Sequence, residues 1–441
     1  MEPKKNLETA SETLSTNVNT RLDTPLSPEF IKKSSLWKRG FLVGPGILVA
    51  VGYIDPGNWA TDLAGGSYAG YTLLSVVLVS CLLAMFLQIM SARLGIATGK
   101  DLAENTREAW PRYAWLIWIS AELAIIATDL AEVIGSAIAL KLLFSVPITM
   151  GVLLTAFDVF LILALDKRGS HLLERIVASL LFIVACGFVY QLLLARPALG
   201  EVLHGFVPST DLILDPKLLY LAIGIVGATI MPHNLYLHSN LVTQHLSNEN
   251  KSKAATLATI NTIISLSGAM LLNSALIILA GSVFHVPGHI EIAEITEAHR
   301  LLAPLLGSVA APIVFAVMLL ACGQSATITG TLAGQVVMSG FIRLRMRLWI
   351  RRLITRSMAI IPAILVILYC GEHALTELIV SSQVFLSLQL PIAMISVLIL
   401  TSQVHRMGLL VNRFWMKQLG WISALIIILA NAVLITQIIL K

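Results

Sequence analysis

The sequence predicts an all-α polytopic membrane protein of about eleven transmembrane helices, the first and sixth of which are discontinuous. Composition predicts the class: of 441 residues, 57% are hydrophobic and only 12% are charged, which is too apolar for a soluble domain. The apolar residues also fall into runs of about 20, the length that crosses a bilayer as a helix. A proline near the middle of the first and sixth runs predicts the two interruptions.

Apolar runs between charged, proline or glycine positions predict the spans in order. They are residues 42–67, 72–94, 114–143, 147–165, 173–194, 217–244, 254–284, 307–340, 354–371, 375–401 and 419–440. Residues 1–37 are polar and lack the apolar core of a cleavable signal, so we expect a disordered cytoplasmic tail. Residues 38–441 are expected to form one transmembrane domain embedded in the lipid bilayer.

The basic residues predict the orientation. With the N-terminus inside, 25 of the 30 Lys and Arg residues lie in cytoplasmic segments, as the positive-inside rule requires. The five that would lie outside are Lys141, Arg196, Lys217, Arg300 and Lys441. An omitted or extra span would reverse the side of every later loop, so the C-terminus is expected to face outward. Topology thus explains the net charge of +5, and no nucleic-acid partner is needed.

Two proline-centred tetrapeptides interrupt apolar segments, DPGN at 55–58 and MPHN at 231–234. A proline removes a backbone donor and leaves carbonyls unpaired, which membrane proteins tolerate only inside protein or beside a polar cavity. Asp55 is a carboxylate at membrane depth, which costs roughly 2.5 to 3.5 kcal/mol on insertion scales and points to function. The alternative is a pair of kinks with incidental polar neighbours. We interpret the tetrapeptides as two halves of one ion site.

The two breaks lie five spans apart. An odd offset inserts equivalent elements with opposite topology, which is the inverted-repeat design of many secondary transporters. The expected repeats cover about 42–194 and 217–401, with 419–440 as an additional helix.

The residue types at the breaks predict the ion. The Asp55 carboxylate and the Asn58 amide oxygen are hard ligands, whereas the Met231 thioether is soft and disfavours Mg and Ca. The mixture favours a borderline divalent transition metal. With a single carboxylate, the site is expected to bind weakly enough to release its cargo. Met231 as a simple core filler is the alternative.

Glu122, Asp129 and Glu132 form a second constellation in the third segment. Spacings of seven and three place them on one helical face, which is too costly against lipid. They are expected to face a wet path or basic partners. The partners available are His233, His238, Arg351 and Arg352. A proton route is the functional interpretation, and a structural ion-pair cluster is the alternative. For His238 we favour an interhelical hydrogen bond.

Five stretches carry a resemblance to a known family. They are GYIDPGNWATDLAGGSYAGY, TDLAEVIGSAIAL, MPHNLYLHSN, GQSATITGTLAGQ and SSQVFLSLQLP. From about Trp37 onward the chain resembles the natural resistance-associated macrophage protein family of proton-coupled divalent metal transporters, in particular its bacterial manganese branch. The resemblance implies a LeuT-like inverted 5+5 repeat, as in the sodium-coupled amino-acid symporters.

The resemblance also implies site residues. The metal ligands would be Asp55, Asn58, Met231, the carbonyls of Ala228 and Gly52, and Gln383. The proton route would use His233, Asp129, Glu132, Arg351 and Arg352.

Together these observations predict a proton-coupled secondary transporter of a bacterial inner membrane that imports Mn(II) and Fe(II) by alternating access, without a cofactor and without enzymatic activity. The chain has no G-x-x-x-x-G-K, H-E-x-x-H or nucleophile-elbow motif, so ATP-driven transport and hydrolysis have no residues to perform them. Two alternatives stay open: a metal-gated channel or metal sensor, and the same fold with an amino-acid cargo.

Overall fold

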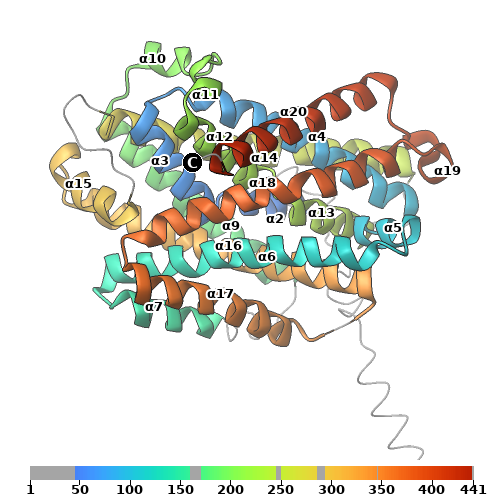
Figure 1. Ribbon diagram of the computed structural model, residues 1–441, viewed down its shortest axis with the longest axis horizontal. Helices are drawn as coiled ribbons and strands as arrows, with labels where there is room; N and C mark the ends of the chain where they lie inside the picture. Colours follow the sequence, from blue (N-terminus) through green and yellow to red (C-terminus); the bar gives the residue numbers. More distant parts are fainter. Residues whose placement is uncertain (1–44, 159–169, 245–249, 286–293, 345, 440–441) are drawn as a thin grey trace, which may run out of the picture.

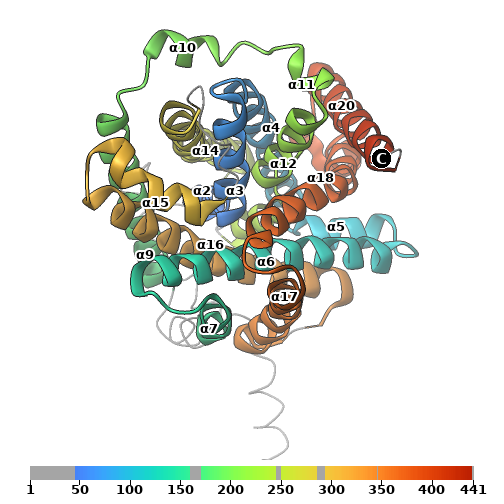
Figure 2. The same ribbon diagram turned by 60° about the vertical axis from the view of Figure 1, so that its left-hand side comes forward.

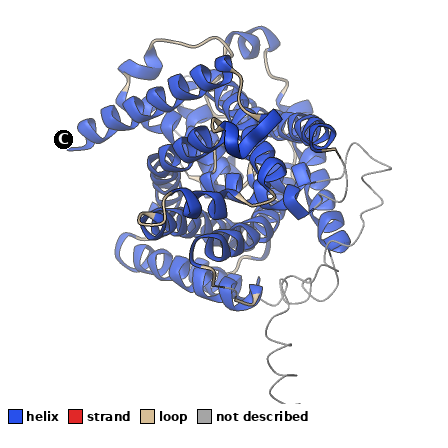
Figure 3. Ribbon diagram, turned by 90° about the vertical axis from the view of Figure 1, so that its right-hand side faces the viewer, coloured by secondary structure: helices blue, strands red, loops and turns tan. Residues whose placement is uncertain are grey.

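The computed structural model describes residues 45–158, 170–244, 250–285, 294–344 and 346–439. This part of the chain is helical and contains no strand (Figure 3). The helices are α2 Pro45–Gly52, α3 Pro56–Ala69, α4 Leu74–Thr98, α5 Leu102–Ala109, α6 Ala114–Phe144, α7 Ile148–Leu154, α9 Ser170–Ala195, α10 Leu199–His204, α11 Asp211–Leu214, α12 Pro216–Thr229, α13 Pro232–Gln244, α14 Lys251–Val283, α15 Ile295–Leu306, α16 Ala310–Ile342, α17 Leu348–Cys370, α18 Ala374–Thr401, α19 Val404–Met407 and α20 Phe414–Ile439.

The eleven-span architecture is confirmed. Within the described ranges, nine helices are long and apolar enough to cross a membrane, with α12 and α13 counted as one broken span. The pair α2 and α3 forms the first broken span, and α7 with the 3₁₀ turn Thr155–Phe157 begins the fourth. Residues 159–165 of that span, and the expected tail at 1–37, lie outside the described residues. The domain boundary at 37 therefore stays a prediction.

Each broken span has a local cause. Asp55 has an extended backbone (φ −92°, ψ 169°), and its Oδ1 accepts the Asn58 N–H at 2.8 Å, so it caps the start of α3. Pro56 follows at the first helical position, where a missing N–H costs nothing. In the sixth span α12 ends at Thr229 and α13 begins at Pro232, so a proline again takes the first helical position after the break.

Packing follows the inverted repeat. Helix α3, the second part of the first broken span, packs on α14 of the second repeat. Its counterpart α13, the second part of the sixth span, packs on α4 of the first repeat. The third and eighth spans, α6 and α16, pack along each other (Figure 1). Figure 2 shows α3 and α12 in the interior, with α9 and α15 on one side and α20 on the other. The two breaks consequently lie within the bundle.

The structure corrects one sequence-based boundary and adds two helices. The ninth span begins at Leu348 rather than 354, so Arg351 and Arg352 lie inside α17. Hydropathy placed the boundary too late because these charges are neutralised by partners far away in the sequence. Two connecting segments are helices that hydropathy did not indicate: α15 begins after Glu294 and carries Glu297 in its first turn, and α5 starts with a capping box between Asp101 and Glu104.

Candidate metal site and buried charge network

The two helix breaks contact each other directly. A Cβ atom on Gly52, the last residue of α2, would lie 2.3 Å from Asn234 Nδ2 in the first turn of α13. The same Asn234 Nδ2 donates a hydrogen bond to Met231 Sδ at 3.5 Å. Glycine at 52 is therefore what permits the approach, and Asn234 connects the first break to the second.

Helix α18 packs against both broken spans at Gln383. A Cβ on Gly57 would lie 2.4 Å from Gln383 Cδ, and a Cβ on Gly227 of α12 would lie 2.0 Å from the Gln383 carbonyl oxygen. Two glycines thus admit Gln383 between the breaks. Its Nε2 donates to Ser382 Oγ at 2.9 Å, which leaves its Oε1 without a partner.

Two backbone carbonyls at the breaks lack hydrogen-bond donors. Gly52 and Ala228 each lie four residues before a proline, Pro56 and Pro232, which has no N–H to donate. Among the described residues no other group donates to either oxygen. These are the two carbonyls that the family resemblance implied.

The neighbouring carbonyl of Tyr53 is different, because it accepts from Asn58 Nδ2 at 2.5 Å and from Asn273 Nδ2 at 2.9 Å. At the first break the Tyr53 carbonyl is therefore paired, whereas the Gly52 carbonyl is not.

Several buried side-chain acceptors of this region also lack a donor. They are Asp55 Oδ2, Asn58 Oδ1, Asn234 Oδ1 and Gln383 Oε1. Each unsatisfied buried acceptor costs about 1–3 kcal/mol, more when it is charged, so several in one place need an electropositive occupant. Hard oxygens around one carboxylate, beside a thioether, suit a borderline divalent metal. Among the described residues no group of three or more His, Cys, Asp or Glu side chains is arranged to hold a metal ion, so a site here depends on amides and carbonyls.

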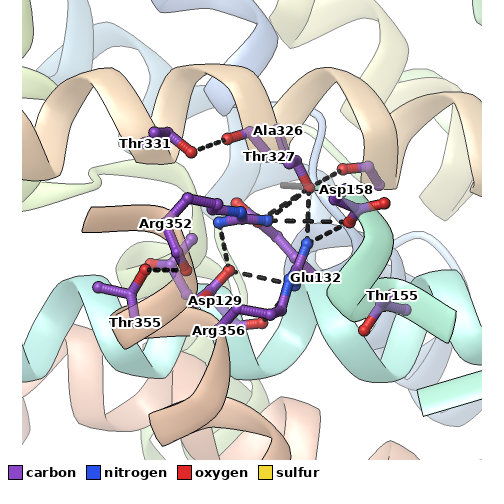
Figure 4. Close-up of polar contacts among 12 residues, drawn as sticks. Asp129, Glu132, Thr155, Asp158, Ala326, Thr327, Thr331, Arg352, Thr355 and Arg356 are labelled. Atoms are coloured by element: carbon purple, nitrogen blue, oxygen red, sulfur yellow. Dashed lines mark hydrogen bonds and ion pairs between the residues drawn. The ribbon is translucent and has the colours of Figure 1, made fainter. Parts of the chain in front are cut away.

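Asp129 and Glu132 of α6 are paired with Arg352 of α17 (Figure 4). Arg352 Nη1 lies 2.6 Å from Asp129 Oδ1, and its Nη2 lies 3.1 Å from Glu132 Oε2. Glu122 pairs with Arg351. The carboxylate stripe therefore faces basic partners, one of the two surroundings that the sequence predicted.

Arg356, Asp158 and Thr327, which the sequence analysis did not assign to the network, complete it. Arg356 Nη1 lies 3.1 Å from Asp129 Oδ1, and Arg356 also pairs with Asp158, which follows α7 and its 3₁₀ turn. Thr327 of α16 donates to Glu132 Oε2 at 3.1 Å and accepts from Arg352 Nη2 at 2.9 Å. The spacing of 352 and 356, one helical turn, was the available signal.

The two histidines of α13 have separate surroundings. His238 Nδ1 lies 2.9 Å from Gln88 Oε1 of α4, which confirms the interhelical hydrogen bond. His233 is 2% exposed and its Nδ1 has no partner. Among the described residues no hydrogen bond or ion pair joins His233 to the α6 carboxylates, so its role in a proton route stays a prediction.

Comparisons with known proteins agree with this fold. A family model described as natural resistance-associated macrophage protein-like matches residues 46–437. The chain is 51% identical to the divalent metal cation transporter MntH of Brucella suis, over 89% of this chain and 87% of that protein.

Among solved structures, a manganese transporter of Eremococcus coleocola is 41% identical, with a TM-score of 0.83 over 93% of this chain and 89% of that one. Mhp1, a nucleobase-cation-symport-1 family transporter, shares the fold alone: it has a TM-score of 0.61 at 15% identity, over 89% of this chain and 91% of that one. The predicted LeuT-like fold is thereby confirmed. The chain belongs to the natural resistance-associated macrophage protein-like family.

Proposed function

We propose that this protein is a secondary transporter that imports divalent transition metal ions, Mn(II) and Fe(II), with protons, by alternating access. The observation that carries the proposal is the junction of the two broken helices. There the Asp55 carboxylate, the Asn58 and Gln383 amide oxygens, two bare carbonyls and the Met231 thioether come from adjoining elements, with acceptor atoms left unpaired.

The names of the relatives support a metal cargo. The Brucella suis protein is called a divalent metal cation transporter, and the Eremococcus coleocola protein a manganese transporter. An amino-acid cargo fits less well. A carboxylate substrate would need the electropositive start of α3, where Asp55 already accepts the Asn58 N–H.

Proton coupling rests on the charge network. Four buried carboxylates, Glu122, Asp129, Glu132 and Asp158, face the three guanidinium groups of α17. With every group ionised the network carries one excess negative charge, which a proton can neutralise. We infer a proton route through Asp129, Glu132 and His233. A metal-gated channel or sensor would not need such a route, since neither couples metal flow to protons.

The proposed location is a bacterial inner membrane, with the N-terminus cytoplasmic and the C-terminus periplasmic. It rests on the asymmetry of the basic residues.

Uptake by proteoliposomes tests the metal cargo. We expect wild-type protein to accumulate Mn(II) and Fe(II) against their gradients when a proton gradient is directed inward, and Asp55→Asn to abolish uptake. Asp215→Asn is the matched control, because Asp215 is also an N-cap before a proline but lies away from the breaks. Metal uptake that only dissipates its own gradient would identify a channel. Wild-type uptake by a correctly inserted Asp55→Asn protein would contradict the site.

A pH-sensitive dye inside the same liposomes tests coupling. We expect Asp129→Asn to reduce Mn(II)-stimulated acidification more than Mn(II) binding, because Asp129 contacts arginines and not the metal-site residues. Acidification at the wild-type rate would show that the network is purely structural.

A further inference from the structure

Asn234 occupies in the second break the position that Asn58 occupies in the first. Each is the third residue of its helix, two positions after the proline, and three residues beyond Asp55 or Met231 respectively. Both side chains are buried, at 1% exposure or less, and both keep an amide oxygen without a donor. Their N–H groups differ. Asn58 donates to a backbone carbonyl, whereas Asn234 donates to the Met231 sulfur.

Chemistry determines which way the Asn234 amide is turned. A thioether sulfur only accepts, so the group 3.5 Å from Met231 Sδ has to be the NH₂. The carbonyl half then points elsewhere. The amide cannot swing freely either, because its Nδ2 lies against the Gly52 backbone, where even a Cβ atom would clash.

A methionine held in this way differs from an ordinary buried methionine. The side chain has three rotatable bonds and normally samples several rotamers. One sulfur lone pair accepts the Asn234 N–H, and the other stays available to a metal ion. Fixing the sulfur beforehand removes part of the ordering cost that binding would otherwise include.

We propose that Asn234 is a positioning residue that sets the preference of the site for soft metal ions by holding the Met231 thioether toward the cargo. This proposal rests on the proposed metal-transport function. Cd(II) is softer than Mn(II) and depends more on the sulfur, so loss of the hold weakens Cd(II) binding more than Mn(II) binding.

The test is calorimetric titration of the full-length protein in detergent with Cd(II) and with Mn(II). For Asn234→Ala we expect the ratio of Cd(II) to Mn(II) affinity to fall about fivefold, the effect of one ordinary hydrogen bond. Asn412→Ala is the matched control, since Asn412 Nδ2 donates to Met90 Sδ at 3.2 Å away from the breaks. It should leave the ratio at the wild-type value.

A double-mutant cycle separates positioning from general packing. In a Met231→Ala background, Asn234→Ala should leave the ratio unchanged, because no sulfur remains to be held. The same fivefold fall in that background overturns the proposal.

Asn234→Asp keeps the shape and an oxygen but removes the N–H donor, and it serves also if the alanine variant does not fold. We expect its ratio to fall as in Asn234→Ala. A wild-type ratio for Asn234→Asp would show that the oxygen, not the donor, matters. If wild-type protein bound neither metal, the proposed function would itself be refuted, and this inference with it; metal binding with an unaltered ratio in the variants refutes the inference alone.

Discussion

Replacing Arg352 with methionine should destabilise the protein more than any other single change in the charge network. Arg352 is 2% exposed and contacts Asp129 at 2.6 Å, Glu132 at 3.1 Å and the Thr327 hydroxyl at 2.9 Å. Without it, Asp129 still has Arg356 at 3.1 Å, but Glu132 keeps only the Thr327 hydroxyl. One fully buried carboxylate is then uncompensated.

Breaking a buried pair by removing one partner costs about 3–5 kcal/mol. That is a large share of a typical unfolding free energy of about 5–15 kcal/mol. Because the cost is that of an unpaired negative charge, it should shrink as the pH falls and the carboxylate takes up a proton. It should also shrink when Glu132→Gln is added to Arg352→Met, since that removes the charge itself.

The assay is denaturant unfolding in detergent micelles at pH 8 and pH 6, for Arg352→Met, the double variant and Arg351→Met. Arg351 is the matched control, because its one ion pair within the described part of the chain is with Glu122 at the edge of the network, where the two side chains are 7% and 12% exposed, and it should lose less. If Arg352→Met stays within about 1 kcal/mol of wild type at pH 8, or if Glu132→Gln rescues nothing, the network is not the electrostatic unit inferred here.

Two glycines and one capping residue give further tests. Gly227→Ala should lower the free energy of unfolding by about 1–3 kcal/mol or more, because its Cβ would lie 2.0 Å from the Gln383 carbonyl oxygen. Gly268→Ala, whose Cβ would have no atom within 4 Å, should instead stabilise α14 by about 0.5–1 kcal/mol. Equal unfolding free energies for the two variants in denaturant would contradict both expectations. Burial, and then the charge of Glu104, raise the pKa of Asp101, which caps α5 outside the spans, from 3.8 to about 7. The folded protein therefore binds this proton more tightly than the unfolded chain, and stability falls as the pH rises from about 4 to 7. Asp101→Asn removes this pH dependence. The free energy of unfolding of the variant, measured relative to wild type, should therefore rise across that pH window by about 4 kcal/mol, from a starting value lowered by about 1 kcal/mol because the hydrogen bond from Asn240 is altered. Parallel profiles of unfolding free energy against pH would refute this expectation.

Much of the fold was predictable because its causes are local. A proline removes its own N–H and the partner of the carbonyl four residues earlier, whatever surrounds it, so both breaks and the two bare carbonyls follow from residue order. Span lengths follow from hydropathy, and orientation from the basic residues. The same reasoning failed at α17, where the charges of Arg351 and Arg352 hid the first six residues of the helix because their partners lie in α6.

The candidate site also has a part that the sequence predicted and a part that only the structure shows. Sequence and family resemblance named Asp55, Asn58, Met231 and Gln383 as candidate ligands, and their roles stay predictions. Neither indicated that Asn234 would contact both Gly52 and Met231. That contact depends on how closely α2 approaches α13.

The sequence by itself determined where the helices break, which residue types stand at the breaks and that the chain crosses the membrane about eleven times. Only the tertiary structure decided which charges pair and which acceptors stay unpaired. Arg352 reaches Asp129 across 223 residues of chain, and Arg356 reaches Asp158 across 198. Which backbone carbonyls are hydrogen-bonded depends on residues within one helical turn. Which side chains pair depends on packing between helices that are distant in the sequence.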